Sequence, residues 1–117
     1  MSEARLKTKI WIQAQVRICD LNALPVAVVH RGDPDAGTVL LRLIRAAGRS
    51  LLLRRSSSFD GAAGWMVVAG ADEVEAAAAD AYIARERARD RDLWVLEIED
   101  IAGRYPLDAP ILRKPRV

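Results

Sequence analysis

The 117-residue chain has little of several things that point to a particular chemistry. Its single cysteine excludes an internal disulfide and favours a reducing, cytoplasmic location. One cysteine and one histidine cannot supply the ligand cluster of a transition-metal site, so we expect no metal, and no motif suggests a cofactor. No run reaches the ~18 apolar residues of a membrane span, and no apolar segment of signal-peptide length follows the basic N-terminus.

What is present is the composition of an ordered globular protein, with 51% apolar and 29% charged residues. The length allows one hydrophobic core. We predict a single domain over residues 1–108, followed by a loosely ordered basic tail at 109–117, which contains two prolines and three basic residues.

The net charge of +2 hides an uneven distribution. Residues 1–59 contain ten Lys and Arg against four acids, whereas residues 60–117 contain eight against twelve. Five of the arginines lie in segment 42–55, which has no acid and no aromatic residue. Either the two halves neutralise one another across neighbouring strands, or the basic segment binds an anionic partner.

Hydrophobic periodicity and turn residues indicate an α+β fold. Strands are predicted at 26–29, 38–45, 49–56, 65–68 and 93–99. The connection Ala46–Gly48 predicts a hairpin with a left-handed last loop residue. Trp94, Leu96 and Ile98 are expected on one face of the last strand.

Two segments have helical signals. Residues 10–22 fit either a strand or a helix, and their length favours a helix. A second, longer helix is predicted to open at Asp72, with Glu75 three residues on as in a capping box. Its expected apolar stripe comprises Val74, Ala77, Ala78, Ala81 and Tyr82. We therefore predict an antiparallel sheet of about five strands covered by one long helix, with an N-terminal helix or strand.

The stretch HRGDPDAG at 30–37 contains the only histidine and an Arg-Gly-Asp tripeptide. Its spacing of Asp33 and Asp35 lacks the later ligands of a calcium loop. Gly32 and Gly37 are turn residues, and Asp33 can bond its own downstream backbone. The segment is predicted to be a strand-connecting turn that can also frame a binding site.

Two further clusters are candidate sites. Glu97, Glu99 and Asp100 could hold a divalent ion in a small metal-dependent hydrolase or nuclease, with Asp33, His30 or Arg31 converging on them. The alternative, which we favour, is that they pair with arginines of a neighbouring strand. A phosphate or nucleic-acid site would need an exposed group of arginines, namely Arg42, Arg49, Arg54 and Arg55.

Three segments, KIWIQAQVR, RGDPDAGTVLLRL and DLWVLEIEDIAGR, together resemble a family of short bacterial proteins, domain of unknown function 1491. The resemblance runs from Leu6 to Leu107 and implies a stand-alone cytoplasmic bacterial protein without an assigned activity. The matched positions are candidate site residues: Arg31, Gly32, Asp33, Gly37, Trp65, Trp94, Glu97, Glu99 and Asp100.

The function predicted from these observations is that of a non-catalytic binding or interaction module. We expect it to form a homodimer and to use the sheet or the 30–37 loop against a protein or small-molecule partner. The hydrolase and the polyanion-binding protein remain the alternatives.

Overall fold

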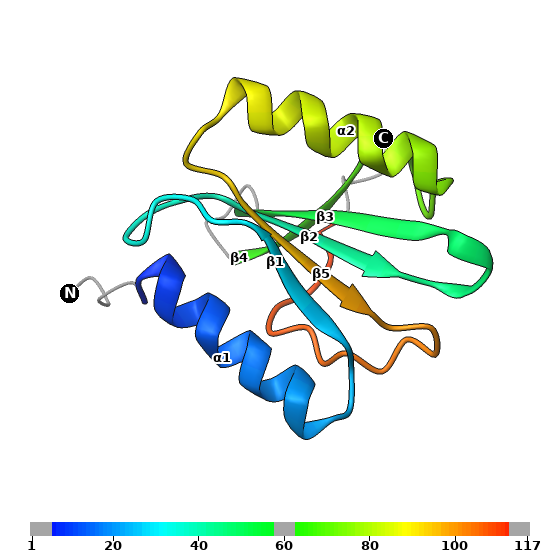
Figure 1. Cartoon of the computed structure of the whole chain (residues 1–117), viewed down its shortest axis with the longest axis horizontal. Coiled ribbons are helices and arrows are strands. Elements are labelled where there is room, and N and C mark those ends of the chain that lie inside the picture. Colours follow the sequence, from blue (N-terminus) through cyan, green and yellow to red (C-terminus); the bar gives the residue numbers. More distant parts are fainter. Residues whose placement is uncertain (1–5, 58–62, 113–117) are drawn as a thin grey trace.

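The computed structural model describes residues 6–57 and 63–112, which form a five-stranded sheet with one helix on each face (Figure 1). In chain order the elements are α1 (Thr8–Leu21), β1 (Val26–His30), β2 (Val39–Ile44), the short 3-10 helix η1 (Ala46–Gly48), β3 (Ser50–Ser57), β4 (Ala63–Val68), α2 (Ala76–Arg89) and β5 (Trp94–Glu99). The strand order is β1-β5-β2-β3-β4. The α+β class is confirmed. Neither helix in these ranges is long and apolar enough to cross a bilayer.

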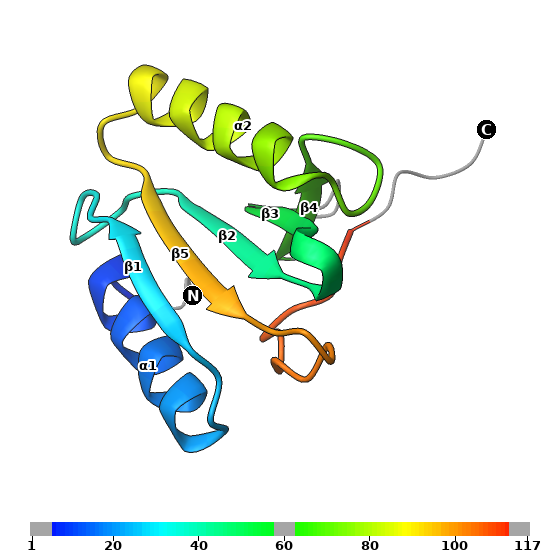
Figure 2. The same ribbon diagram turned by 45° about the vertical axis from the view of Figure 1, so that its right-hand side comes forward.

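The prediction of a purely antiparallel sheet is wrong, because β5 lies between β1 and β2 and runs parallel to β2. The chain leaves β4, crosses one face of the sheet as α2 and enters the sheet between β1 and β2 as β5 (Figure 2). Trp94 to Leu96 are all buried, as expected for a central strand covered on both faces.

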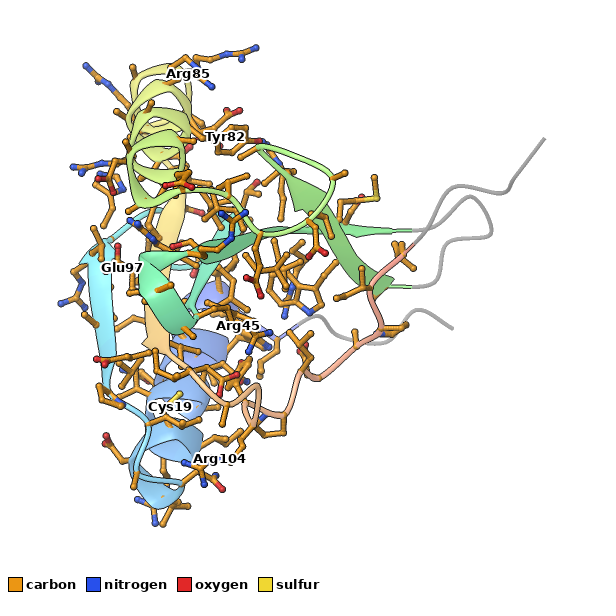
Figure 3. The ribbon with its side chains drawn as sticks, turned by 90° about the vertical axis from the view of Figure 1, so that its right-hand side faces the viewer. Cys19, Arg45, Tyr82, Arg85, Glu97 and Arg104 are labelled. Carbon is orange, nitrogen blue, oxygen red and sulfur yellow. The ribbon has the colours of Figure 1, made fainter. Side chains whose placement is uncertain are left out.

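A helix covers each face of the sheet, in place of the single long covering helix predicted. On the α1 face, the core contains Trp11, Ile12, Cys19, Leu41, Leu53, Trp94, Leu96 and Ile98. On the α2 face it contains Leu40, Leu52, Ala79, Ile83 and Val95. Side chains fill both spaces (Figure 3). The predicted common face of Trp94, Leu96 and Ile98 is confirmed.

The ambiguous N-terminal segment is a helix, as favoured. Trp11, Gln15 and Cys19 are buried at intervals of four residues, whereas Ile10, which a strand would have buried with its alternate neighbours, is exposed. Ala23 at φ 56° and Pro25 then take the chain out of the helix and into β1.

Helix α2 begins three residues later than predicted, because Glu75 rather than Asp72 is the N-cap residue, and no side chain caps its start. The reason lies in Val74, whose N–H donates to Ser50 O (2.8 Å) and whose carbonyl accepts from Ser50 N (2.9 Å). This bridge to β3 keeps the segment before Glu75 extended, so the capping box cannot form. The predicted stripe is wrong in part, although Val74 and Tyr82 do pack half-buried against the core on the α2 face. Ala77, Ala78 and Ala81 are exposed, and the buried positions are Ala79 and Ile83.

The predicted hairpin between β2 and β3 is confirmed, with Gly48 at φ +71° and Ala47 also left-handed at φ 58°. The start of the predicted tail is attached to β4, because Trp65 N–H donates to Pro110 O (2.9 Å) and Leu112 N–H donates to Trp65 O (2.8 Å). Residues 58–62, between the third and fourth predicted strands, and the end of the predicted tail at 113–117 lie outside the described residues.

Candidate functional site

The residues selected from the sequence lie in three separate places. His30, Arg31, Gly32, Asp33, Gly37 and Trp94 gather where β1 ends and β5 begins. Glu97, Glu99 and Asp100 lie at the other end of β5. Trp65 lies on β4, beside the segment that precedes the C-terminus.

The 30–37 loop packs against the start of β5. Asp33 N–H donates to Asp92 O (3.1 Å), and the Trp94 indole N–H donates to Asp33 O (2.7 Å). The backbone approach is so close that a Cβ on Gly32 would lie 2.0 Å from Asp92 O, and one on Gly37 would lie 2.3 Å from the same oxygen. Only glycine fits these two positions.

The predicted turn chemistry of this loop is confirmed. The Asp33 carboxylate accepts from the Ala36 backbone N–H at 2.8 Å. The loop also holds the start of α1, because the N–H groups of Thr8 and Lys9 donate to loop carbonyls at 3.3 and 2.9 Å. These bonds replace the absent side-chain cap, so the loop ties α1 to the sheet.

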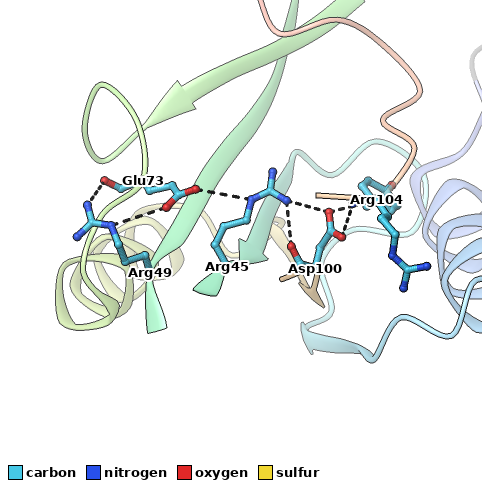
Figure 4. A network of polar contacts seen from close by, with 6 residues as sticks. Arg45, Arg49, Glu73, Asp100 and Arg104 are labelled. Atoms are coloured by element: carbon cyan, nitrogen blue, oxygen red, sulfur yellow. Dashed lines mark hydrogen bonds and ion pairs between the residues drawn. The ribbon is translucent and has the colours of Figure 1, made fainter. Parts of the chain in front are cut away.

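The three late carboxylates do not meet the loop. Glu97 pairs with Arg42 at 3.3 Å across the parallel strands, which confirms the favoured pairing with an arginine of a neighbouring strand. The Asp100 carboxylate is buried and accepts from Arg45 Nη1 (2.9 Å) and from the backbone N–H groups of Arg104 (2.6 Å) and Tyr105 (3.0 Å) (Figure 4). The convergence that the hydrolase needs is absent, because Asp33 lies against the opposite end of β5. Within the described ranges, no three His, Cys, Asp or Glu side chains could share a metal ion.

The arginines of segment 42–55 are mostly neutralised by acids from the second half of the chain. Their partners are Asp80 and Glu97 for Arg42, Asp100 for Arg45, Glu73 and Glu75 for Arg49, Glu86 for Arg54, and Asp108 for Arg55. Arg42 is itself buried. The polyanion site required these side chains to be exposed together, and that requirement is not met.

Trp65 belongs to a packed cluster that sequence reasoning missed. The Asp108 carboxylate accepts from the indole N–H groups of Trp11 (2.8 Å) and Trp65 (3.0 Å), and Arg55 lies over both rings. Trp65 is fully buried. Its role in this cluster is to join α1, the sheet and the C-terminal segment, and nothing local around Asp108 signals it.

Ionisable groups with raised pKa values lie in the core. Burial raises the pKa of the Cys19 thiol to about 11, as expected for a packed, unreactive side chain. Burial also raises the pKa of the Tyr105 hydroxyl, which donates to the buried Gln15. A smaller rise in the pKa of Tyr82 has the same first cause.

Two hollows flank β1, one on each face of the sheet. The first, the α1–β1 hollow, has a volume of about 220 Å³ and is lined by Lys9, Ile12, Gln13, Val16, Val28, Arg31 and Trp94. Arg31 and Trp94 were predicted site residues, whereas the α1 residues and Val28 were missed. The spacing of Lys9, Gln13 and Val16 in the sequence predicts that they share one face of a helix. It does not predict that this face lies near Arg31.

The second, the α2 hollow, is a more open depression of about 400 Å³ lined by His30, Ala84, Arg87, Ala88 and Arg91. His30 Nδ1 is 2.6 Å from Leu93 O. Because a carbonyl only accepts, Nδ1 carries the proton in this contact, which fixes the ring at the end of β1.

A family model and two solved structures identify one family. The model described as protein of unknown function (DUF1491) matches residues 6–108. A crystal structure of a DUF1491 family protein from Caulobacter crescentus CB15 has a TM-score of 0.82 at 34% identity and covers 92% of this chain and 100% of that one. An NMR structure of a DUF1491 family protein from the same organism gives 0.81 at 33% identity, with 95% and 100% covered. A solution structure of a protein from A. tumefaciens gives 0.72 at 26% identity, with 97% and 100% covered. No curated protein matches the chain.

Proposed function

We propose that this chain, which belongs to the DUF1491 family of proteins of unknown function, is a non-catalytic binding protein whose ligand occupies the α1–β1 hollow. The resemblance noted from the sequence is confirmed, and it carries no activity with it. One observation carries the proposal: this hollow combines an apolar floor with two basic side chains from different elements, Lys9 of α1 and Arg31 after β1. Such a site fits a small ligand that has an apolar body and a carboxylate.

The floor consists of Ile12, Val16, Val28 and the Trp94 side chain. The indole N–H of Trp94 is already bonded to Asp33 O, so the ring offers apolar surface. A volume of about 220 Å³ corresponds to roughly seven waters of the liquid. This size suits a short aliphatic or aromatic group. Pockets with apolar walls and a few placed polar groups are the usual form of small-molecule sites.

The rim supplies charge that is not neutralised. Lys9 and Arg31 make no ion pair with a carboxylate of the described residues, whereas the nearby Lys7 is 3.7 Å from Asp35. Lys9 comes from α1 and Arg31 from the loop after β1. A guanidinium binds a carboxylate through two parallel hydrogen bonds, and an ammonium adds a point charge.

The chemistry of the lining supports binding rather than catalysis. Among the described residues, its ionisable side chains are Lys9 and Arg31, and no carboxylate, cysteine or histidine lines the hollow beside them. The groups with raised pKa values, Cys19, Tyr82 and Tyr105, are not among its lining residues. Activated nucleophiles and bases normally lie in the cleft where they act. The cytoplasmic location stays a prediction from the single cysteine.

The test is an NMR titration of the folded chain with hexanoate. Two control ligands are titrated in parallel: acetate, which keeps only the carboxylate charge, and hexanol, which keeps only the apolar body. We expect hexanoate to move the Trp94 indole N–H and Val28 signals in a saturable way, and the two control ligands to bind much more weakly. A peptide ending in a free leucine carboxylate, compared with its amide, distinguishes a polypeptide terminus from a free acid.

The matched variants are Arg31→Gln in the rim and Arg17→Gln, which removes an exposed arginine of α1 outside the hollow. Loss of one charge-assisted contact of about 1.5 kcal/mol or more should weaken hexanoate binding at least about tenfold in Arg31→Gln. Arg17→Gln should bind as the unmodified chain does. Equal binding by the two variants, or acetate binding as strong as hexanoate binding, would refute the proposed ligand class.

A further inference from the structure

We propose that two copies of this chain associate through the exposed edge of β1, with the two β1 strands antiparallel. The proposal does not rest on the ligand of the α1–β1 hollow. It gives the predicted homodimer a surface and a geometry, both argued from the free edge of the sheet and the charges at its two ends.

The two edges of the sheet differ. The edge strand β4 has a neighbour, because Trp65 exchanges backbone hydrogen bonds with Pro110 and Leu112. The other edge strand, β1, pairs only with β5 among the described residues (Figure 2). An edge of this kind is a template for a further strand.

The register identifies which backbone groups are free. Glu99 N–H donates to Pro25 O at 2.8 Å, so this pair of positions is a hydrogen-bonded one. Because bonded and non-bonded pairs alternate in an antiparallel ladder, the N–H and C=O groups of Val26 and Val28 point away from β5. They can bond a second strand without disturbing the first.

The side chains of this edge are apolar and exposed. Ala27, Val28 and Val29 are all accessible, and Val28 and Val29 are 39% and 41% exposed. A register shift between Val28 and His30 limits regular pairing to the first half of β1. Bulges and short edges restrain indiscriminate pairing, so a specific partner must add contacts beyond the ladder.

Charged groups near the two ends of β1 supply those contacts, and their arrangement favours a second copy of this chain as the partner. At the start of β1 lies Glu99, which is exposed and makes no ion pair with the described residues. At the end of β1 lies the α2 hollow, with Arg87 and Arg91. Both groups lie on the α2 side of the sheet, because Glu99 is two residues beyond Glu97, which contacts Arg42 and faces α2.

Antiparallel pairing about a two-fold axis places the acidic end of one β1 beside the basic end of the other, twice. Parallel pairing would bring like charges together. The edge is therefore self-complementary only in the antiparallel arrangement, which also closes the assembly at two copies. The helices of each copy remain on the faces of the joined sheet, away from the new ladder (Figure 1).

Sedimentation equilibrium from 10 µM to 1 mM protein, at low and high salt, tests the pairing. The unmodified chain should form a dimer, more weakly as salt rises. Val28→Lys should raise the dissociation constant at least about tenfold. The matched control Ile10→Lys changes a comparably exposed aliphatic side chain (48% against 39%) on α1, away from the ladder, and should leave the constant unchanged. A monomer at 1 mM in low salt would overturn the proposal, and so would a Val28→Lys chain that is folded by circular dichroism and still dimerises like the control.

A charge exchange tests the antiparallel geometry. Glu99→Arg and Arg91→Glu should each weaken the dimer by about threefold at low salt, as expected for an exposed ion pair. The double variant should recover the original constant. Additive weakening in the double variant would overturn the antiparallel contact. Neither residue lines the α1–β1 hollow, so hexanoate binding by these variants reports on the proposed function independently.

Discussion

Removal of the Asp100 carboxylate should destabilise the fold far more than removal of its neighbour. Asp100 is 1% exposed, and three donors depend on its carboxylate: the Arg45 guanidinium and the backbone N–H groups of Arg104 and Tyr105. These contacts hold the chain after β5 against the β2–β3 hairpin (Figure 4). Asp100→Ala leaves the two backbone N–H groups without this acceptor and takes the carboxylate from Arg45, which keeps Asp100 O (3.0 Å) and Glu73 (3.9 Å) as partners.

The magnitude follows from burial. The N–H of the buried Tyr105 loses its only acceptor in the described chain, which costs about 1–3 kcal/mol. Arg45 is largely buried and loses a charged partner. Breaking a buried pair typically costs about 3–5 kcal/mol, and we expect Asp100→Ala to fall in that range. Asp100→Asn keeps one acceptor oxygen and should lose about half as much.

Urea unfolding followed by tryptophan fluorescence measures the effect. With an m-value of about 1.5 kcal/mol/M, the midpoint should fall by about 2–3 M in Asp100→Ala. The control is Glu99→Ala, which removes an exposed carboxylate one residue earlier and should change stability by less than about 0.5 kcal/mol. If the alanine variant does not fold, the asparagine variant still gives a value. A loss below about 1 kcal/mol in Asp100→Ala would refute the structural role of this carboxylate.

Three other outcomes are expected. Gly32→Ala should cost more than about 2 kcal/mol by urea unfolding, because its Cβ would lie 2.0 Å from Asp92 O, whereas Gly48→Ala, with open space around it, should cost only about 1–2 kcal/mol for its positive φ. Cys19 should resist a thiol reagent at pH 8 until the chain unfolds, since a pKa of about 11 leaves roughly one thiolate in a thousand. Stability should fall as pH rises above about 9. The folded-state pKa values of Cys19 and Tyr105 are raised, so unfolding at high pH releases protons. A urea midpoint that stays constant from pH 8 to 11 would contradict this.

Features that depend on a few neighbouring residues could be predicted from the sequence. Gly48 takes the left-handed conformation that the hairpin needed, and the Asp33 side chain bonds the backbone three residues on. The alternation of Trp94, Leu96 and Ile98 identifies a strand and its core face. In each case the physical cause, a steric preference or a side-chain period, is contained in the segment itself.

Features that depend on distant partners could not be predicted. The start of α2 is set by the bridge from Val74 to Ser50, which overrides a good local capping sequence. The Asp108 carboxylate accepts from Trp11, 97 residues away, and no local pattern indicates such a contact. The parallel position of β5 likewise follows from the packing of two helices on two faces of the sheet, which hydrophobic periodicity leaves undetermined.

The candidate site lay between these two cases. The 30–37 segment was identified because its residues are unusual, and its turn chemistry explains Gly32, Gly37 and Asp33 without any ligand. What remains for function is the pair of side chains that the turn does not use, Arg31 and His30, which line the hollows on opposite faces of β1. The other walls come from α1 and α2, so only the fold could show them.

Charge pairing distinguishes the two hollows from the basic hairpin. The acids of the second half of the chain meet the arginines of β2, β3 and the hairpin between them, so the excess of positive charge in the first half is largely neutralised there. The basic side chains that line the two hollows at the end of β1 receive no such partner from the described residues. The fold therefore neutralises its buried and hairpin arginines but not these cations. The remaining positive charge lies at β1, where the edge of the sheet is also free. Recognition by this protein should therefore weaken with salt at β1, while the stability of its core should respond much less.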